Sequence, residues 1–214
     1  AYMRRFHRPA SRTLVPTESQ RARLASRGFS GLGVWGRGVD TQIFRPGDKS
    51  FLDRYGAMAR PVSLYMGRVA VEKNIDAFLS LDLPGTKVVV GDGPDRARLS
   101  RVYPDAVFVG EKSGRDLSRH IAGADVFVFP SLTDTFGVVL LEAMACGIPV
   151  AAYPVTGPID VVRHGMTGWL DNDLGYAVRR ALTLDPAACL DEASRRTWRA
   201  CTERFASHLV LARP

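Results

Sequence analysis

Residues 126–150 read VFVFPSLTDTFGVVLLEAMACGIPV and combine a strand, a polar loop, a helix and the start of another strand. The run Val126–Phe129 is apolar without interruption, a pattern typical of a strand that is covered on both faces of a parallel sheet. Val138–Cys146 has the composition of a buried helix, and we expect this helix to begin near Phe136 or Gly137. Three side chains are candidates for its N-terminal cap: Thr133, Asp134 and Thr135.

The same alternation of apolar runs and helical segments continues on both sides of this stretch. The candidate strands are Val62–Met66, Lys87–Val90, Ala106–Val109, Val126–Phe129 and Val150–Tyr153. The candidate helices between them are Asn74–Leu81, Asp95–Tyr103, Arg115–Ala122 and Val138–Cys146. This repetition predicts an α/β fold with a doubly wound parallel sheet of the Rossmann-like kind. Ligands of such sheets bind at the carboxyl ends of the strands, so we expect functional residues directly after each strand.

Three parts of the chain are predicted. Residues 1–36 form the tail end of an earlier domain or a lead-in βαβ unit, in which Thr17-Glu-Ser-Gln20 has the spacing of a capping box. Residues 37–185 form the Rossmann-like domain. Residues 186–214 form a C-terminal helix, expected to begin at Pro186. Four of its side chains fall at helical spacing and are expected to pack in the core: Trp198, Cys201, Phe205 and Leu209.

The composition limits the class of protein. The 214 residues are 46% hydrophobic and 24% charged, which excludes a disordered, collagen-like or disulfide-stapled chain. No apolar run approaches the roughly 18 residues that span a bilayer, and Ala1–Pro16 lacks the apolar stretch of a secretory signal. Three cysteines without metal-ligand spacing favour a reduced, cytoplasmic setting. The net charge of +7 suits a phosphate-bearing ligand, nucleic acid or an anionic membrane face, and it equally suits an inert basic surface.

Glu142 is the one charged side chain of the predicted helix Val138–Cys146. A carboxylate that is buried without partners costs several kcal/mol, so some group must interact with its oxygens. One interpretation is a buried hydrogen bond to the backbone or to an internal arginine. The other is a pair of ligand hydroxyls, such as a ribose diol. At the start of the same helix, Gly137 leaves room for a ligand beside backbone amides that favour an anion.

Two other strand ends carry residues suited to a phosphate-bearing ligand. Gly67 and Arg68 follow the first strand of the predicted sheet, and Lys73 comes five residues after Arg68. The guanidinium fork and the ammonium group together can offset the charge of a diphosphate. Away from a strand end, an Arg and a Lys at this spacing are usually a solvated surface pair. Gly91 and Gly93 follow the second strand and let backbone pass near a ligand, which is a weak signal by itself.

The spacing of Asp134 and Glu142, with seven residues between them, resembles the Glu-x7-Glu signature of the retaining GT-B glycosyltransferases. Asp replaces the first Glu, which keeps the charge on a side chain one methylene shorter. The string Gly67-Arg-x-x-x-Glu-Lys73 resembles the diphosphate clamp of that family, and Val107-Phe-Val-Gly110 resembles its base-binding loop. The motifs occur in family order, so the chain is identified as resembling the C-terminal, donor-binding half of such an enzyme.

The resemblance implies retaining transfer of a hexose from a nucleoside-diphosphate sugar, such as a UDP-sugar or GDP-mannose, to an acceptor hydroxyl. It implies catalytic roles for Arg68 and Lys73, which stabilise the departing diphosphate, and for Asp134, which contacts the sugar. Glu142 then binds the ribose hydroxyls. The remaining donor-binding residues that it implies are Gly67, Gly91, Gly93, Val109, Phe136, Gly137 and Val138. It implies no metal ion and no cofactor apart from the donor substrate.

The resemblance also implies that a preceding domain binds the acceptor, a glycan or a lipid. We expect that N-terminal domain to be missing from this chain, which alone would bind donor weakly and transfer nothing. A cytoplasmic location is expected, with peripheral contact at the inner face of the membrane as an open alternative.

Two other function classes remain open. One is a non-catalytic nucleotide-binding or regulatory module, which would show no sugar preference. The other is a basic protein that binds nucleic acid or a membrane surface, and only the net charge supports it, so no nucleic-acid partner is expected. No histidine has a carboxylate or nucleophile at useful spacing, so neither a catalytic triad nor a metal site is predicted.

Overall fold

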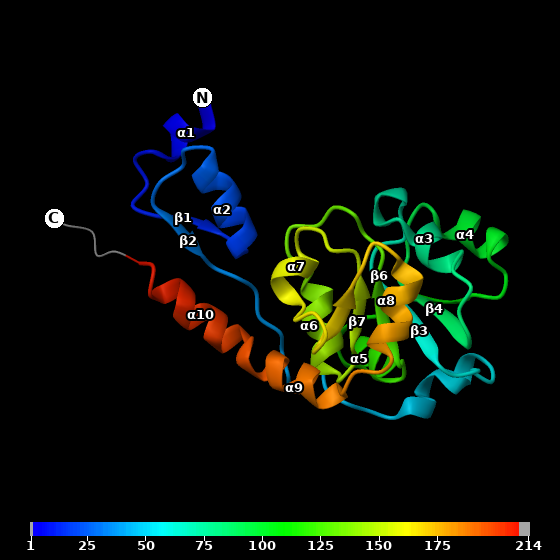
Figure 1. Ribbon diagram of the computed structural model, residues 1–214. Coiled ribbons are helices and arrows are strands. Elements are labelled where there is room, and N and C mark those ends of the chain that lie inside the picture. Colours follow the sequence, from blue (N-terminus) through cyan, green and yellow to red (C-terminus); the bar gives the residue numbers. More distant parts are fainter. Residues whose placement is uncertain (1, 210–214) are drawn as a thin grey trace.

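The computed structural model describes residues 2–209 and contains a parallel sheet of six strands (Figure 1). Across the sheet the strand order is β5-β4-β3-β6-β7-β8. The strands are β3 (Val62–Met66), β4 (Thr86–Val90), β5 (Val107–Gly110), β6 (Val126–Phe129), β7 (Val150–Ala152) and β8 (Gly168–Leu170). This architecture confirms the predicted doubly wound α/β fold. The sixth strand, β8, was not predicted.

Both faces of the sheet are buried, which explains the uninterrupted apolar runs. Leu64 and Met66 belong to the core on one face, and Tyr65 between them belongs to the core on the other. Side chains of α5 (Gly114–Ala122), α6 (Val138–Ala145) and α9 (Pro186–Arg195) fill the first core. Side chains of α3 (Ile75–Leu79), α4 (Arg96–Val102) and α8 (Leu174–Ala181) fill the second.

The strand order reverses between β3 and β6. From β3 the chain proceeds outward to β4 and β5, and it then returns to the other side of β3 to form β6. The loops after β3 and β6 therefore leave the sheet in opposite directions and open a crevice at its carboxyl edge, which is the usual ligand site of doubly wound sheets. The segments that follow these two strands are Gly67–Lys73 and Pro130–Gly137.

A small unit precedes the sheet. It contains α1 (Tyr2–His7) and two parallel strands, β1 (Thr13–Val15) and β2 (Leu32–Val34), joined by α2 (Glu18–Ser26). The Thr17 side chain accepts a hydrogen bond from the amide of Gln20, which confirms the helix start that the capping-box spacing predicts. A linker that includes the short helix η1 (Lys49–Tyr55) leads from this unit to β3.

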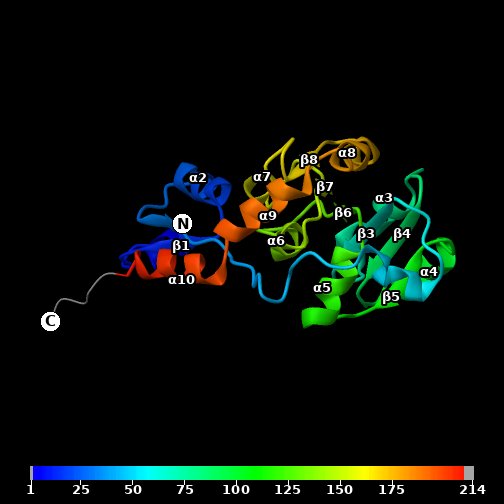
Figure 2. The same ribbon diagram turned by 90° about the horizontal axis from the view of Figure 1, so that it is seen from below.

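The prediction of a single C-terminal helix is wrong. The chain forms two helices, α9 and α10 (Trp198–Ala206), and the Thr197 hydroxyl caps the second by accepting from the amide of Ala200. The linker packs against this break, since a Cβ at Gly38 would lie 2.4 Å from the amide nitrogen of Trp198. After this break α10 extends away from the sheet and lies beside β1 and β2 in both views (Figures 1 and 2).

Of the four C-terminal side chains that were expected to pack in the core, two do so. Phe205 packs on Trp35 of the linker with ring centroids 4.9 Å apart, and Cys201 is buried. Trp198 and Leu209 are instead 47% and 66% exposed. The α10 helix buries one narrow stripe against the small unit, so side chains at the edge of that stripe remain in contact with solvent.

The cysteines and the helices bear on the cellular environment expected from the sequence. The three cysteines, Cys146, Cys189 and Cys201, are buried free thiols. None of the helices within residues 2–209 combines the length and the apolar character that crossing a lipid bilayer requires.

Candidate functional site

Two adjoining cavities occupy the crevice between the β3 and β6 loops. The first, here called the β4-side cavity, has a volume of about 440 Å³ and reaches from the β3 loop to the ends of β4 and β5. The second, the β6-side cavity, has a volume of about 320 Å³ and reaches to the loop that precedes α6. Four residues line both cavities: Met66, Gly67, Arg68 and Val139. The two cavities are therefore parts of one continuous site.

Arg68 and Glu142 line the same β4-side cavity. Glu142 is on the second turn of α6, three residues after Val139, so both side chains face the cavity from one side of the helix. Within residues 2–209 the Glu142 carboxylate accepts no hydrogen bond and forms no ion pair. Burial raises the pKa of this carboxyl group above its usual value. The internal hydrogen bond considered from the sequence is thus not formed, and the carboxylate is available to a bound molecule.

Lys73 and Asp134 meet across the β6-side cavity. The Nζ atom of Lys73 lies 3.2 Å from Oδ2 of Asp134, and both side chains are largely shielded from solvent. The short 3-10 helix η2 (Val71–Lys73) carries the lysine, while the loop after β6 carries the aspartate. Arg68 stands at the boundary of the two cavities and is mostly exposed, with Nη1 3.7 Å from Oε1 of Glu72. Two predicted cations and one predicted acid are therefore gathered at the strand-order reversal.

The start of α6 differs from the sequence-based expectation. Gly137 occupies the N-cap position with a φ of 79°, and no side chain caps the helix. Asp134 instead accepts a hydrogen bond from the amide of Thr135, with Oδ1 and N 2.9 Å apart. A Cβ at Gly137 would lie 2.9 Å from Cδ1 of Leu140, so this glycine also permits the helix to pack. Val138 and Val139, the first residues of α6 after Gly137, line the β6-side cavity.

Gly91 and Gly93 shape the crevice through backbone packing. A Cβ at Gly91 would lie 1.9 Å from the carbonyl oxygen of Gly67, and one at Gly93 would lie 2.2 Å from that of Val69. Backbone hydrogen bonds join the two loops, including Gly67 N to the carbonyl of Val90 at 3.0 Å. The absence of a side chain at these glycines therefore makes room for the backbone of the β3 loop. Gly91 also lines the β4-side cavity.

Some residues of the crevice were missed by the sequence analysis, and two predicted residues, Gly93 and Val109, line neither cavity. Val109 is buried within β5 and does not line either cavity. Glu111 and Lys112, directly after β5, line the β4-side cavity, and the rule that ligands bind at strand ends could have identified them. Arg37 lines the β6-side cavity from the linker, where no sequence pattern indicates a functional residue.

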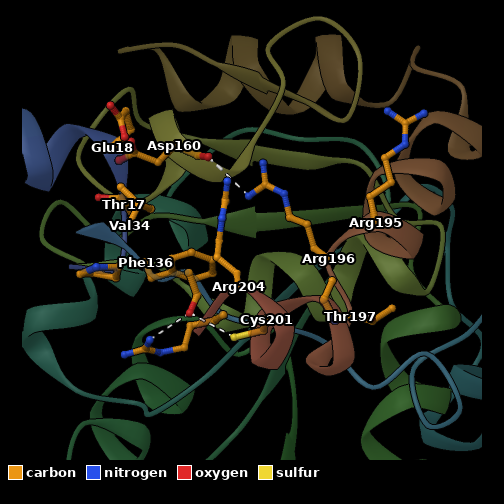
Figure 3. Close-up of a pocket in the computed structure, with 14 residues that line it drawn as sticks. Thr17, Glu18, Val34, Phe136, Asp160, Arg195, Arg196, Thr197, Cys201 and Arg204 are labelled. Carbon is orange, nitrogen blue, oxygen red and sulfur yellow. Dashed lines mark hydrogen bonds between the residues drawn. The ribbon is translucent and has the colours of Figure 1, made fainter. Parts of the chain in front are cut away.

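A third cavity, here called the interunit cavity, lies between the small unit and the helices α9 and α10 (Figure 3). Its volume is about 460 Å³, and it shares Arg37 and Phe136 with the β6-side cavity. Asp160, in the short helix α7 (Pro158–Val161), joins the two units at this point. Its carboxylate accepts hydrogen bonds from the amide of Ser19, at 3.0 Å, and from the hydroxyl of the same residue.

Comparison with known proteins places the chain in a family. Residues 60–183, more than half of the chain, match the sequence profile of the family described as "Glycosyl transferases group 1". The chain is 38% identical over 174 residues to a "GDP-mannose-dependent alpha-mannosyltransferase" of Mycobacterium tuberculosis, a match that covers 79% of this chain and 46% of that protein. It is 33% identical over 229 residues to the "Sulfoquinovosyl transferase SQD2" of Arabidopsis thaliana, covering 95% of this chain and 45% of that protein. The chain thus spans about half the length of the relatives that it matches.

Solved structures share the fold. Anabaena HepE, solved in complex with UDP and glucose, superposes with a TM-score of 0.77 at 21% identity and covers 92% of this chain and 62% of its own. Sucrose-phosphate synthase from Thermosynechococcus elongatus also gives a TM-score of 0.77, at 26% identity, with 91% and 56% covered. These superpositions confirm the Rossmann-like architecture predicted from the sequence.

Proposed function

The chain belongs to the group 1 glycosyl transferases, and from that premise we propose that the crevice binds a nucleoside-diphosphate sugar as the donor of a hexosyl transfer. The observation that carries the proposal is the shared β4-side cavity of Arg68 and Glu142, which adjoins the Lys73–Asp134 pair. A cavity with a basic boundary and a carboxylate on each side suits a molecule with a diphosphate between two hydroxyl-bearing groups. The relatives named for GDP-mannose and the UDP-bound neighbour support this ligand class.

Each part of the donor has a counterpart in the crevice. Glu142 accepts hydrogen bonds from the ribose hydroxyls in the β4-side cavity, while Arg68 and Lys73 bind the diphosphate. Asp134 accepts from the hydroxyls of the sugar, beside the amides of Phe136, Gly137 and Val138. Gly67, Gly91 and Gly93 hold the loops that form this surface, and the segment from Val109 to Lys112 lies toward the base.

The chemistry is electrostatic. When the bond between the sugar and the diphosphate breaks, negative charge develops on the leaving group, and cations fixed beside it lower the barrier. Lys73 is paired with Asp134 before donor binds. We expect donor binding to exchange this partner, so that the ammonium group faces the diphosphate and the carboxylate faces the sugar. Because two side-chain cations perform this task, we propose that transfer needs no metal ion. The resemblance of the Asp134–Glu142 spacing to the retaining GT-B signature supports transfer with retention.

Most of the acceptor, a glycan or a lipid, is proposed to bind to a further domain, in line with the length of the relatives. On this proposal the 214-residue chain binds donor and transfers nothing by itself. The site of action is proposed to be cytoplasmic, at the inner face of the membrane where the acceptor is a lipid. No observation favours a regulatory module or a nucleic-acid-binding protein.

Calorimetric titration of the chain with GDP, UDP, ADP and their hexose conjugates tests the proposal. Arg68→Ala should weaken diphosphate binding by about 1.5–3 kcal/mol, the range for a charge-assisted hydrogen bond. Glu142→Gln should weaken nucleotides and leave inorganic diphosphate unchanged. Arg101→Ala, an exposed arginine of α4, is the control for the loss of one positive charge. Equal losses in Arg68→Ala and Arg101→Ala, or equal losses of nucleotide and diphosphate in Glu142→Gln, would contradict the assignments.

A further inference from the structure

The interunit cavity carries an excess of positive charge. Four arginines line it, from the linker and from the α9–α10 segment: Arg37, Arg195, Arg196 and Arg204. Among the described residues, two acidic side chains line it, those of Glu18 and Asp160. The cavity volume of about 460 Å³ lies in the range of small-molecule sites. This cavity is separate from the two that the donor is proposed to occupy, although it meets one of them at Phe136 and Arg37.

Most of these charges already have partners. Arg195 pairs with Asp191 and Arg196 with Glu192, both with closest distances of 2.7 Å. The Asp160 carboxylate is engaged by the amide and hydroxyl of Ser19. The Glu18 carboxylate pairs with Arg21 on its own helix.

Two arginines lack such a partner. Within residues 2–209 the Arg204 guanidinium forms no hydrogen bond and no ion pair. Arg37 donates only to backbone carbonyls, with Nη1 3.0 Å from the oxygen of Gly36. The excess positive charge of the cavity therefore resides mainly on these two side chains.

Figure 3 shows how the guanidinium groups lie. The side chains of Arg196 and Arg204 both point toward the part of the cavity beside Asp160, and they enter from the α9–α10 segment. Two like charges that converge repel each other, and an anion between them converts this repulsion into attraction. The planar guanidinium fork matches the oxygens of a tetrahedral oxyanion in a bidentate manner.

We propose that the interunit cavity binds the phosphate group of a phosphorylated acceptor, with Arg204 as its unpaired ligand and the converging Arg196 beside it. The identification of the bound molecule as the acceptor rests on the proposed function. The anion site itself rests only on the charges of the cavity. Phe136 forms a wall of both the interunit cavity and the β6-side cavity. A molecule anchored by its phosphate on one side of Phe136 can direct a hydroxyl toward the sugar held on the other side. The acceptor class is therefore a polyol or sugar that bears a phosphomonoester.

Amide chemical shifts of the isotope-labelled chain provide the test. Glycerol 1-phosphate, inorganic phosphate and glycerol are titrated at constant ionic strength, and the amides of Thr17 and Ala200 report on the interunit cavity. We expect saturable shifts with glycerol 1-phosphate, weaker binding of inorganic phosphate and none of glycerol. Arg204→Gln should lower the affinity for glycerol 1-phosphate about tenfold or more, as loss of a charge-assisted hydrogen bond does.

Arg199→Gln is the matched control, because it removes the same charge from the same helix. The Arg199 side chain is 88% exposed and pairs with Glu203 outside the cavity, so affinity should stay within about twofold. Equal losses in both variants would indicate a general charge effect and overturn the site. Inorganic phosphate binding as tightly as glycerol 1-phosphate would overturn the acceptor assignment.

Binding to the donor crevice is measured separately in the same samples. Shifts at Thr17 that disappear in Arg68→Ala would show that the phosphate binds in the donor crevice, which would overturn the interunit site. Binding of GDP should be unchanged by Arg204→Gln. Failure of GDP to bind the unmodified chain would contradict the proposed function and leave the outcome at Thr17 to decide the anion site independently.

Discussion

The crevice at the sheet edge and the interunit cavity are built in different ways. The crevice takes most of its residues from segments that directly follow strands of one sheet, β3, β4, β5 and β6, so the hydrogen-bonded ladder fixes their relative positions. The interunit cavity takes its residues from the start of α2, the linker, α7 and α10. Its shape therefore depends on how two units dock, through contacts such as that between Ser19 and Asp160. Variants can test whether the first site is rigid and the second depends on docking.

The largest effect on stability is expected from Gly91→Ala, which disrupts the close packing of the loops that form the crevice. Gly91 has a φ of 142°, and its Cβ would collide with the Gly67 carbonyl oxygen at 1.9 Å. Backbone strain and overpacking each cost roughly 1–3 kcal/mol, so the free energy of unfolding should fall by roughly 2–6 kcal/mol. Denaturant unfolding measures this loss.

Gly56→Ala is the control for strain alone, because Gly56 has a φ of 119° and nothing lies within 4 Å of its Cβ position. It should cost only the roughly 1–3 kcal/mol of strain. Equal costs for the two variants would show that the close approach of the β3 and β4 loops contributes nothing.

The second-largest effect is expected from Asp160→Ala, which weakens the contact between the two units. The variant leaves the amide and hydroxyl of Ser19 without their acceptor, a loss of about 1.5–3 kcal/mol for hydrogen bonds to a charged group. Hydrogen exchange should become faster at α2 amides and stay unchanged at β3 amides. Asp53→Ala, an exposed residue of η1, should change neither. Equal acceleration in α2 and β3 would contradict separate docking of the small unit.

The smallest effect concerns Glu142, whose pKa is raised by burial. Its protonated form favours the folded state fully below the unfolded pKa of about 4.5, and this advantage is lost as pH rises through the higher folded pKa. At pH 7 the buried charge therefore costs stability. Glu142→Gln removes this buried charge and should raise the Tm there.

This gain should shrink as pH falls toward 4.5, where the unmodified carboxyl group is protonated. Thermal unfolding between pH 4.5 and pH 8 measures the difference. Glu203→Gln, at an exposed ion pair of α10, should leave the Tm nearly unchanged. A pH-independent gain for Glu142→Gln would show that the carboxylate carries no burial cost, and would remove the physical reason for its availability to a ligand.

Much of the crevice could be predicted from sequence because its signals are local. Val62–Met66 and Val126–Phe129 were assigned as strands with the bounds that the structure has. Residues after a strand end lie at the carboxyl edge whatever else the chain does, so Arg68 and Asp134 could be placed in the correct region. The N-terminal cap of α6 could not be predicted, because Asp134 accepts a hydrogen bond within its own loop and pairs with Lys73 instead of capping the helix.

By itself, the sequence determined the α/β architecture, the strand ends that carry polar residues, and the family. Those properties follow from hydrophobic periodicity and from motifs a few residues long, which need no knowledge of distant contacts. Only the tertiary structure decided that Glu142 shares a cavity with Arg68, that the last helix breaks at Thr197, and that Arg204 reaches the small unit. These depend on contacts between residues far apart in the chain, as Ser19 and Asp160 are, separated by 141 positions. The physical reason is that packing between segments, rather than local propensity, determines where such side chains meet.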